Sequence, residues 1–272
     1  MTPHEFLRHV PKTNCGACGQ PSCLAFAVAV TRGGADPRQC PQVAPAALAE
    51  LGVAAVANGG LPQVEQLGRE RDLALVFYLQ SKIQSLDFRV IAPRLGASWQ
   101  AERPDWLGID YLAQPVALGK TAILLDGQPV ADPRDQILLY NYVASCGGDE
   151  PSGDWLGLES LPNSISKVRT LAMYCETRLA ARYRGRPEVL ERHCRLLGGQ
   201  PGEQTGGAAV VSALPVLPRV PQRLYFWDEE PDDGFEARVK VLFDRQVLHY
   251  LDLESLVFSA ERMAERLCAL DS

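Results

Sequence analysis

Apolar positions near the amino terminus recur at helical spacing in short segments. The pattern predicts a first helix with Thr2 as its N-cap and Glu5 completing a capping box. A second, strongly apolar helix is expected over 23–31, with Ser22 as its N-cap. The sequence therefore predicts a small helical region at this end of the chain.

A third helix is expected over 45–58, and it is followed by Gly59-Gly60-Leu61-Pro62. Glycine and proline in this density interrupt regular structure. We therefore expect a domain boundary here, with one domain at 1–60 and a larger one at 61–272.

The larger domain opens with a helical pattern over 64–85, although its apolar run 73–79 also suits a buried strand. More helices are expected over 132–145, from Asn163 or Ser164 to 183, over 187–197 and over 253–270. Short apolar segments bounded by Gly, Pro or Asp predict strands at 88–91, 115–118, 122–125, 208–214, 223–227 and 237–243.

Two kinds of connection are expected between these strands. Asp126-Gly127 is typical of a two-residue hairpin turn. The Gly-rich segment 198–207 is expected to be a flexible linker, and the Pro-rich segment 215–221 to join two strands. The order of elements predicts an α+β fold, in which a small helical domain precedes a larger mixed domain of helices and sheet.

Composition limits the classes of partner. The net charge of −6 gives no reason to expect nucleic acid. No apolar run approaches the roughly 20 residues that span a bilayer, and the first residues lack a basic region followed by an apolar run. We therefore expect a soluble, cytoplasmic protein with no membrane span.

Four of the eight cysteines lie close together, at Cys15, Cys18, Cys23 and Cys40. In a chain with no apparent leader, metal ligation explains such clustering better than disulfides do. A [4Fe-4S] cluster needs four converging thiolates, and a Cys-x2-Cys turn lets two sulfurs reach neighbouring irons. The spacing therefore predicts a [4Fe-4S] cluster held by these four cysteines.

The neighbouring residues support this prediction. Gly16 and Gly19 each follow a ligand, where only glycine takes unusual backbone angles without strain. Cys23 is expected in the first turn of its helix, where the helix dipole favours an anionic cluster. The alternatives are a zinc site, which usually takes two Cys-x2-4-Cys pairs, a smaller cluster, or no metal.

Residues 12–27 together with Cys40-Pro41 resemble the [4Fe-4S] module of the corrinoid iron–sulfur protein large subunit, from the acetyl-CoA synthase/carbon monoxide dehydrogenase pathway. They are also similar to the module near the start of the Rnf-complex B subunit. The resemblance covers about residues 1 to 60. It implies that the four matching cysteines are cluster ligands. It also implies that the cluster transfers single electrons at low potential. In the corrinoid iron–sulfur protein family this electron reactivates a corrinoid.

Beyond residue 60 the chain departs from both families, because it lacks a cobalamin domain and further clustered cysteine runs. Residues 65–270 instead resemble a domain of unknown function that is often fused to this cluster module. The matching stretches are 135–142, 226–230, 241–244 and 249–256. This resemblance implies no activity.

The remaining candidates are weaker. The four scattered cysteines are expected to be buried apolar residues: Cys146, Cys175, Cys194 and Cys268. Cys146 lies in a Gly-rich loop and is the most reactive candidate among them. The acidic run 228–233 is interpreted as a solvated loop or a docking site for a basic partner. The basic stretch 167–195 is interpreted as a solvated or salt-bridged surface or a site for an anionic ligand. His249 is interpreted as structural.

Three functions remain open on the sequence. The preferred hypothesis is a low-potential [4Fe-4S] protein that transfers one electron to a redox partner protein or a corrinoid protein in anaerobic metabolism. A second makes the larger domain an enzyme or accessory factor, with a small-molecule substrate reduced through the cluster. A third makes the cluster a structural element of an interaction module. The sequence assigns no catalytic residue.

Overall fold

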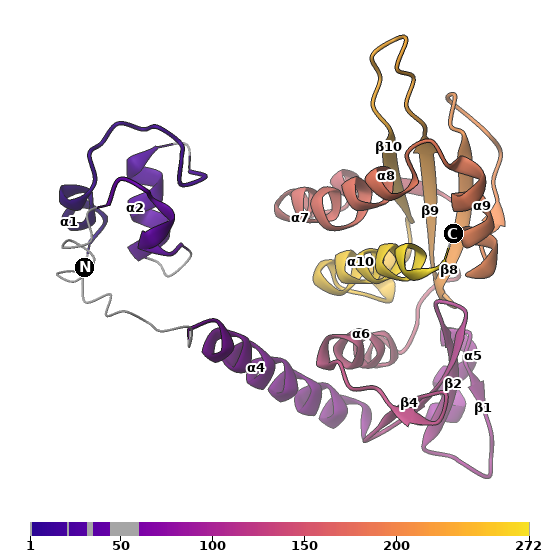
Figure 1. Ribbon diagram of the computed structural model, residues 1–272. Coiled ribbons are helices and arrows are strands. Elements are labelled where there is room, and N and C mark those ends of the chain that lie inside the picture. Colours follow the sequence, from indigo (N-terminus) through magenta and orange to yellow (C-terminus); the bar gives the residue numbers. More distant parts are fainter. Residues whose placement is uncertain (1, 21, 32–34, 44–59, 272) are drawn as a thin grey trace. The chain divides into compact units, whose positions relative to one another are not determined.

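The computed structural model describes residues 2–20, 22–31, 35–43 and 60–271, without the side chains of 60–65 and 67. The chain divides into two compact units, Met1–Gly68 and Arg69–Ser272 (Figure 1). We call them the small unit and the large unit. The helix expected over 45–58 lies outside the described residues.

The small unit begins with the predicted capped helix. In α1 (Pro3–Phe6), Thr2 Oγ1 accepts a hydrogen bond from Glu5 N, and Glu5 Oε2 accepts one from Thr2 N, which confirms the capping box. Helix α2 (Cys23–Thr31) has the predicted bounds, and Ser22 Oγ accepts from Ala25 N. Phe6 and Phe26 meet edge to face, with ring centroids 5.7 Å apart. These rings form the centre of a small core.

Short turns complete the small unit: the 3₁₀ turns η1 (Leu7–His9) and η2 (Pro37–Gln39). Asp36 caps η2 by accepting a hydrogen bond from Arg38 N at 2.8 Å. The next helix, α4 (Gly60–Ile83), continues into the large unit, where Val76, Leu79 and Ile83 are buried in the main core. The region 73–79 is therefore helical, and the alternative of a buried strand is wrong.

The large unit contains two antiparallel five-stranded sheets. The first is a meander of β1 (Ser98–Trp99), β2 (Trp106–Tyr111), β3 (Gln114–Gly119), β4 (Ile123–Leu125) and β5 (Gln128–Pro129). The second has the order β6 (Trp155–Gly157), β10 (Arg238–Asp244), β9 (Val220–Trp227), β8 (Val210–Leu217) and β7 (Gln200–Pro201). Asp126 and Gly127 both have positive φ between β4 and β5, which confirms the predicted hairpin turn.

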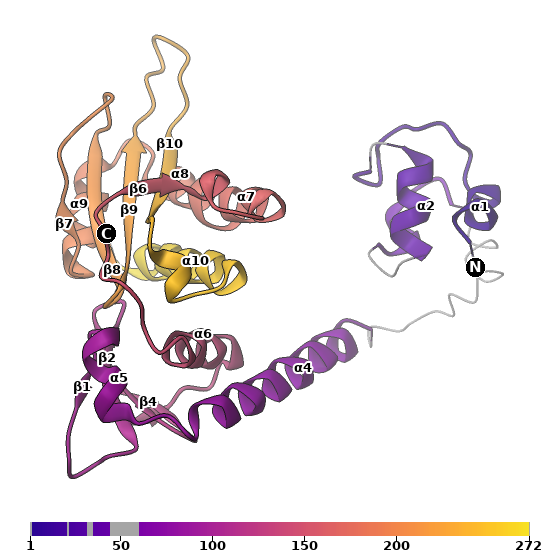
Figure 2. The same cartoon turned by 180° about the vertical axis from the view of Figure 1, so that it is seen from behind.

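Helices pack on one face of the second sheet, as Figures 1 and 2 show for α8 and α10. The helices of the large unit after α4 are α5 (Phe88–Leu95), α6 (Pro133–Ala144), α7 (Ile165–Leu171), α8 (Thr177–Tyr183), α9 (Pro187–Leu196) and α10 (Leu253–Ala269). A π-helical turn, η4 (Ala172–Glu176), lies between α7 and α8. Gln222 of β9 donates a buried hydrogen bond to Ser259 of α10 at 2.7 Å. The structure confirms the α+β fold.

The predicted strand at 88–91 is wrong, because these residues begin helix α5. Asp87 is its N-cap and accepts a hydrogen bond from Arg89 N at 3.0 Å. The buried side chains follow the spacing of one helical face, at Phe88, Ile91, Ala92 and Leu95. A capping aspartate and this spacing outweigh the strand propensity of the short apolar run.

The Pro-rich segment is also not the long connection that the sequence predicts. Strand β8 continues to Leu217 and β9 begins at Val220, so only Pro218-Arg219 form the turn. Pro215 and Pro221 are paired across the hairpin, next to a register shift. Proline is tolerated at such irregular positions, where its missing N–H removes no regular ladder bond.

Candidate functional site

The four clustered cysteines all lie in the small unit and are free thiols. Cys40 is 6% exposed and belongs to the core around Phe6 and Phe26. Cys18 and Cys23 are half-buried and pack against the same core, whereas Cys15 is exposed. Three of the four predicted ligands therefore share one small core, and the fourth lies at the surface.

The loop that carries Cys15 and Cys18 has an unusual backbone. Gly16 and Gly19 have φ values of +73° and +76°, as expected for glycines that follow the cysteines. Lys12 and Asn14 are also left-handed, at +56° and +50°. Non-glycine residues in this region are strained and often mark functional segments. Of these four residues, only Lys12 has a backbone angle that its residue type disfavours.

Asn14 joins this loop to helix α2. Its Oδ1 accepts a hydrogen bond from Cys23 N at 2.8 Å, and its N–H donates to Cys23 Sγ at 3.4 Å. Hydrogen bonds to cysteine sulfur are one of the ways in which proteins tune iron–sulfur clusters. Sequence reasoning missed this residue, although asparagine beside a cysteine motif is one of the few residues that tolerate left-handed angles.

The surroundings of Cys15 favour its thiolate. Hydrogen bonds from the Ala17 N–H and from the Thr13 side chain lower the pKa of the Cys15 thiol below its ordinary value. The thiolate is the form that binds metal. Cys15 therefore has the donor chemistry that a cluster requires.

The described side chains do not converge fully on one point. In the described part of the chain, no three Cys, His, Asp or Glu side chains are grouped closely enough to hold a metal ion. The donor set of four free thiols, two in the loop, one at the start of α2 and one directly after η2, suits an iron–sulfur cluster. The assignment of all four as ligands therefore stays a prediction.

The other cysteines lie apart from this group, in the large unit. Cys175 and Cys194 are buried, and burial raises the pKa of both thiols, for Cys194 to about 12. Cys268 is half-buried, and burial raises its pKa as well. The predicted burial in the apolar core is thus confirmed for Cys175 and Cys194, whereas Cys146 and Cys268 are only half-buried.

Cys146, the most reactive candidate among the scattered cysteines, lies in a tightly packed loop. It is half-buried and left-handed, with φ +58°, and the next residue, Gly147, has φ +75°. A Cβ at Gly147 would lie 2.8 Å from Arg94 Cβ and 2.9 Å from the Arg94 backbone. Arg94 Nη2 also donates to Gly147 O at 3.0 Å. The loop conformation therefore depends on glycine at 147.

We expect Gly147→Ala to lower the free energy of unfolding by about 2 kcal/mol, because it adds left-handed strain and a clash with the Arg94 backbone. Urea unfolding followed by circular dichroism would measure the change. Gly206→Ala is the matched control, since Gly206 is also left-handed at +62° but has no atom within 4 Å of the added Cβ. Equal losses for the two variants would contradict the clash with Arg94.

Several residues of the two charged stretches make ion pairs or hydrogen bonds within the large unit. The basic stretch forms ion pairs between Lys167 and Glu254, Arg178 and Glu265, Arg184 and Glu229, and Arg195 and Glu191. In the acidic run, Asp228 accepts a hydrogen bond from Gly185 N at 2.8 Å. His249 is 47% exposed, with Nδ1 3.9 Å from Asp149 Oδ2. A salt-bridged surface thus describes the basic stretch.

Most of the large unit matches a known family. The model of the domain of unknown function DUF3786 matches residues 87–266. The chain belongs to the DUF3786 family. Its DUF3786 domain contains both sheets, the helices from α5 to α9 and most of α10, and none of the four clustered cysteines lies within it.

A second family and individual proteins also match parts of the chain. Residues 10–42 match the family described as "Putative Fe-S cluster". The chain is 39% identical over 79 residues to the corrinoid/iron-sulfur protein large subunit of Moorella thermoacetica, which is 27% of this chain and 18% of that protein. It is 42% identical over 40 residues to the acetyl-CoA decarbonylase/synthase complex subunit gamma 2 of Methanosarcina thermophila, which is 15% of this chain and 8% of that protein.

These matches support an iron–sulfur cluster in the part of the chain that precedes the DUF3786 domain. The chain spans less than a fifth of the length of either relative. No solved structure matches the chain significantly. Among the described residues, no helix combines the length and apolar character that crossing a bilayer requires.

Proposed function

We propose that this protein holds a [4Fe-4S] cluster through Cys15, Cys18, Cys23 and Cys40 and passes single electrons to a partner protein in the cytoplasm of anaerobically growing cells. A bound cluster supplies reversible uptake of one electron at a potential set by its surroundings. The chain's own residues bind it, shield it and present it to the partner. A corrinoid protein is the kind of acceptor that we propose.

The observation that carries this proposal is the similarity of the chain to the corrinoid/iron-sulfur protein large subunit, at 39% identity over 79 residues, together with the iron–sulfur family match at 10–42. The name of that relative combines a corrinoid with an iron–sulfur cluster. The four free cysteines, two of them separated by Gly16-Ala17, supply the matching donor set. We transfer the corrinoid partner to this chain on that similarity alone.

Residues of the small unit shield the cysteine group from water and provide a hydrogen bond to one of its sulfur atoms. Phe6 and Phe26 exclude water from one side of the cysteine group, because they form the core on which Cys18, Cys23 and Cys40 pack. The Asn14 N–H donates to Cys23 Sγ, which favours the reduced, more negative cluster.

The exposed side of the same group suits electron exchange with a partner. Cys15 is exposed, and Leu24, next to Cys23 in α2, is 47% exposed. A thiolate ligand at the surface shortens the path for an electron to an acceptor that docks there. The exposed Leu24 side chain provides apolar contact area for an acceptor. The small unit thus combines one exposed ligand, Cys15, with three ligands that pack on its core.

Anaerobic reconstitution followed by EPR redox titration tests the proposal. We expect about four irons and four sulfides per chain and a one-electron EPR signal that appears near −400 mV, the range of low-potential ferredoxins. A cluster that a low-potential donor cannot reduce would overturn electron transfer. Tight binding of zinc with no retention of iron would overturn the cluster type and favour the structural interpretation.

A further inference from the structure

Strand β10 has an open edge over part of its length. Its partner on one side, β6, pairs only with Leu242, Phe243 and Asp244. On the other side, β9 pairs with β10 from Arg238 to Phe243. Within the described residues, no strand therefore covers the β6 side of β10 from Arg238 to Val241.

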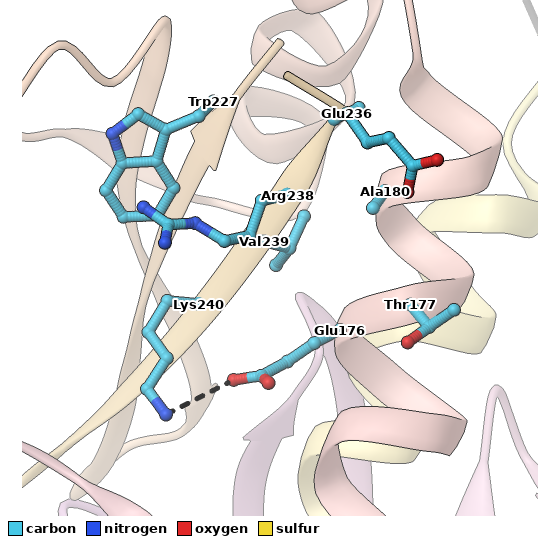
Figure 3. A pocket seen from close by; sticks show the side chains of 9 residues that line it. Glu176, Thr177, Ala180, Trp227, Glu236, Arg238, Val239 and Lys240 are labelled. Carbon is cyan, nitrogen blue, oxygen red and sulfur yellow. Dashed lines mark ion pairs between the residues drawn. The ribbon is translucent and has the colours of Figure 1, made fainter. Parts of the chain in front are cut away.

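A groove of about 450 Å³ follows this open edge. One wall consists of residues 236–240, which end in the first three residues of β10, with Trp227 of β9 beside them. The opposite wall is helical and consists of Glu176, Thr177 and Ala180 (Figure 3). A strand edge that faces a helix across a groove is a geometry that admits an extended peptide.

The backbone of β10 offers hydrogen bonds in this groove. Val241 N donates to Glu176 Oε1 at 3.0 Å, so the N–H of Val241 points toward the helix. Alternate residues of a strand direct their backbone groups to the same side, so Val239 presents its N–H and C=O there as well. In the part of the chain that the structure describes, these two groups of Val239 have no hydrogen-bond partner on that side.

The π-helical turn positions the helical wall. Glu176 is the last residue of η4, and a widened turn of this kind is frequent at functional sites. Its carboxylate closes the edge at Val241, and burial raises its pKa above the ordinary value. Glu176 also faces Lys240 Nζ at 3.8 Å. The backbone N–H of Val241 thus already has a hydrogen-bond partner, whereas the backbone groups of Val239 are available to a ligand.

The two cations on the strand wall, Lys240 and Arg238, differ in whether they have a carboxylate partner. Lys240 Nζ is paired with Glu159 Oε2 at 3.0 Å and with Glu176. Arg238 stacks on the Trp227 ring, 4.3 Å from its centroid, and no carboxylate partner is found for it among the described residues. Arg238 and Lys240 project to the same side of β10, with Trp227, and Val239 projects to the other (Figure 3). Arg238 is therefore the cation available to a ligand.

We propose that this groove binds an extended peptide segment of a partner protein by strand addition to β10. Hydrogen bonds to Val239 hold its backbone. Because the side chains of an added strand alternate, an acidic side chain lies beside Arg238 and a small apolar side chain lies against Ala180 and Val239. The uncovered edge, from Arg238 to Val241, is about 13 Å long and accommodates about four peptide residues. This proposal does not depend on the proposed electron transfer.

Two fluorescein-labelled peptides test the proposal, Ser-Val-Glu-Val-Ser and Ser-Val-Lys-Val-Ser, with blocked termini. Fluorescence anisotropy would follow their binding to the full chain. We expect saturable binding that favours the Glu peptide, and hydrogen exchange of the backbone at 237–241 that slows when it is bound. We expect Arg238→Glu to weaken the Glu peptide about tenfold and to reverse the preference.

Arg192→Glu is the control, because Arg192 is an exposed arginine of α9 with the same change of charge and lies outside the groove. We expect it to leave both affinities unchanged. Absence of saturable binding, equal binding of the two peptides, or an unchanged preference in Arg238→Glu would overturn the proposal. A stable dimer that protects 237–241 without peptide would also overturn it, since a second copy would then occupy the edge.

Discussion

Cys40→Ser is expected to abolish cluster binding. Cys40 is 6% exposed and lies in the core of the small unit, so a serine there removes a thiolate donor and buries a hydroxyl group. Serine oxygen is a harder and poorer ligand for iron–sulfur clusters than cysteine sulfur. We expect the iron content after anaerobic reconstitution to fall from about four atoms per chain to below about one. Iron and sulfide assays with visible absorption would measure this loss.

Cys146→Ser provides the matched control. Cys146 is also a free, half-buried cysteine, but it lies in the large unit and outside the predicted ligand set. We expect this variant to keep its full iron content. Since the two units are compact on their own, we also expect the DUF3786 domain of Cys40→Ser to have the same urea midpoint of unfolding as in the wild-type protein. Retention of about four irons in Cys40→Ser would contradict the assignment of Cys40.

Arg262→Leu is expected to have the largest effect on the stability of the large unit. Arg262 of α10 makes a bidentate ion pair with Asp135 of α6, at 2.9 and 3.0 Å, and it also pairs with Asp132 and Glu265. Tyr111 of β2 donates to Asp135 Oδ1 at 3.0 Å. These contacts connect two helices and the first sheet, and the side chains of Arg262 and Asp135 are only about one-fifth exposed.

The leucine leaves the Asp135 carboxylate without its cation. Burial already raises the pKa of Asp135, and Arg262 is the main group that opposes this effect. Removal of one partner from a buried ion pair typically costs 3–5 kcal/mol, and partial exposure places Arg262→Leu at about 3 kcal/mol. Urea unfolding of the full chain would measure the loss.

A second substitution separates the charge from the packing. We expect Asp135→Asn in the Arg262→Leu background to restore about 1–2 kcal/mol, because the neutral amide still accepts from Tyr111 and no longer buries a charge. The double-mutant cycle gives the coupling between the two side chains directly. A double variant less stable than Arg262→Leu alone would show that the carboxylate is not the source of the loss.

Local patterns predict the elements whose causes are local. The bounds of α2, the capping box at Thr2 and Glu5, and the hairpin turn at Asp126-Gly127 all depend on residues within a few positions of one another. The strand predicted at 88–91 is wrong although its cause is also local, because Asp87 caps helix α5 at this point. Secondary structure was thus predictable where short-range contacts decide it.

The functional contacts were harder to predict, because they join distant segments. Asp135 and Arg262 are 127 residues apart, and Val241 and Glu176 are 65 apart. The sequence identified the four clustered cysteines from their spacing, but not Asn14, whose role depends on a contact nine residues away. Nor does any local pattern indicate the open edge of β10, which results from the shortness of β6.

The spacing of buried residues in the sequence does indicate the π-helical turn. Four buried residues recur at intervals of four, at Leu171, Cys175, Leu179 and Tyr183. In a regular α-helix each such step would rotate the side chain by about 40°, so the last would point about 120° away from the first. The wider turn at 172–176 has more residues per turn and cancels part of this drift. A four-residue apolar repeat therefore encodes the widened turn and keeps one helical face on the core while Glu176 reaches β10.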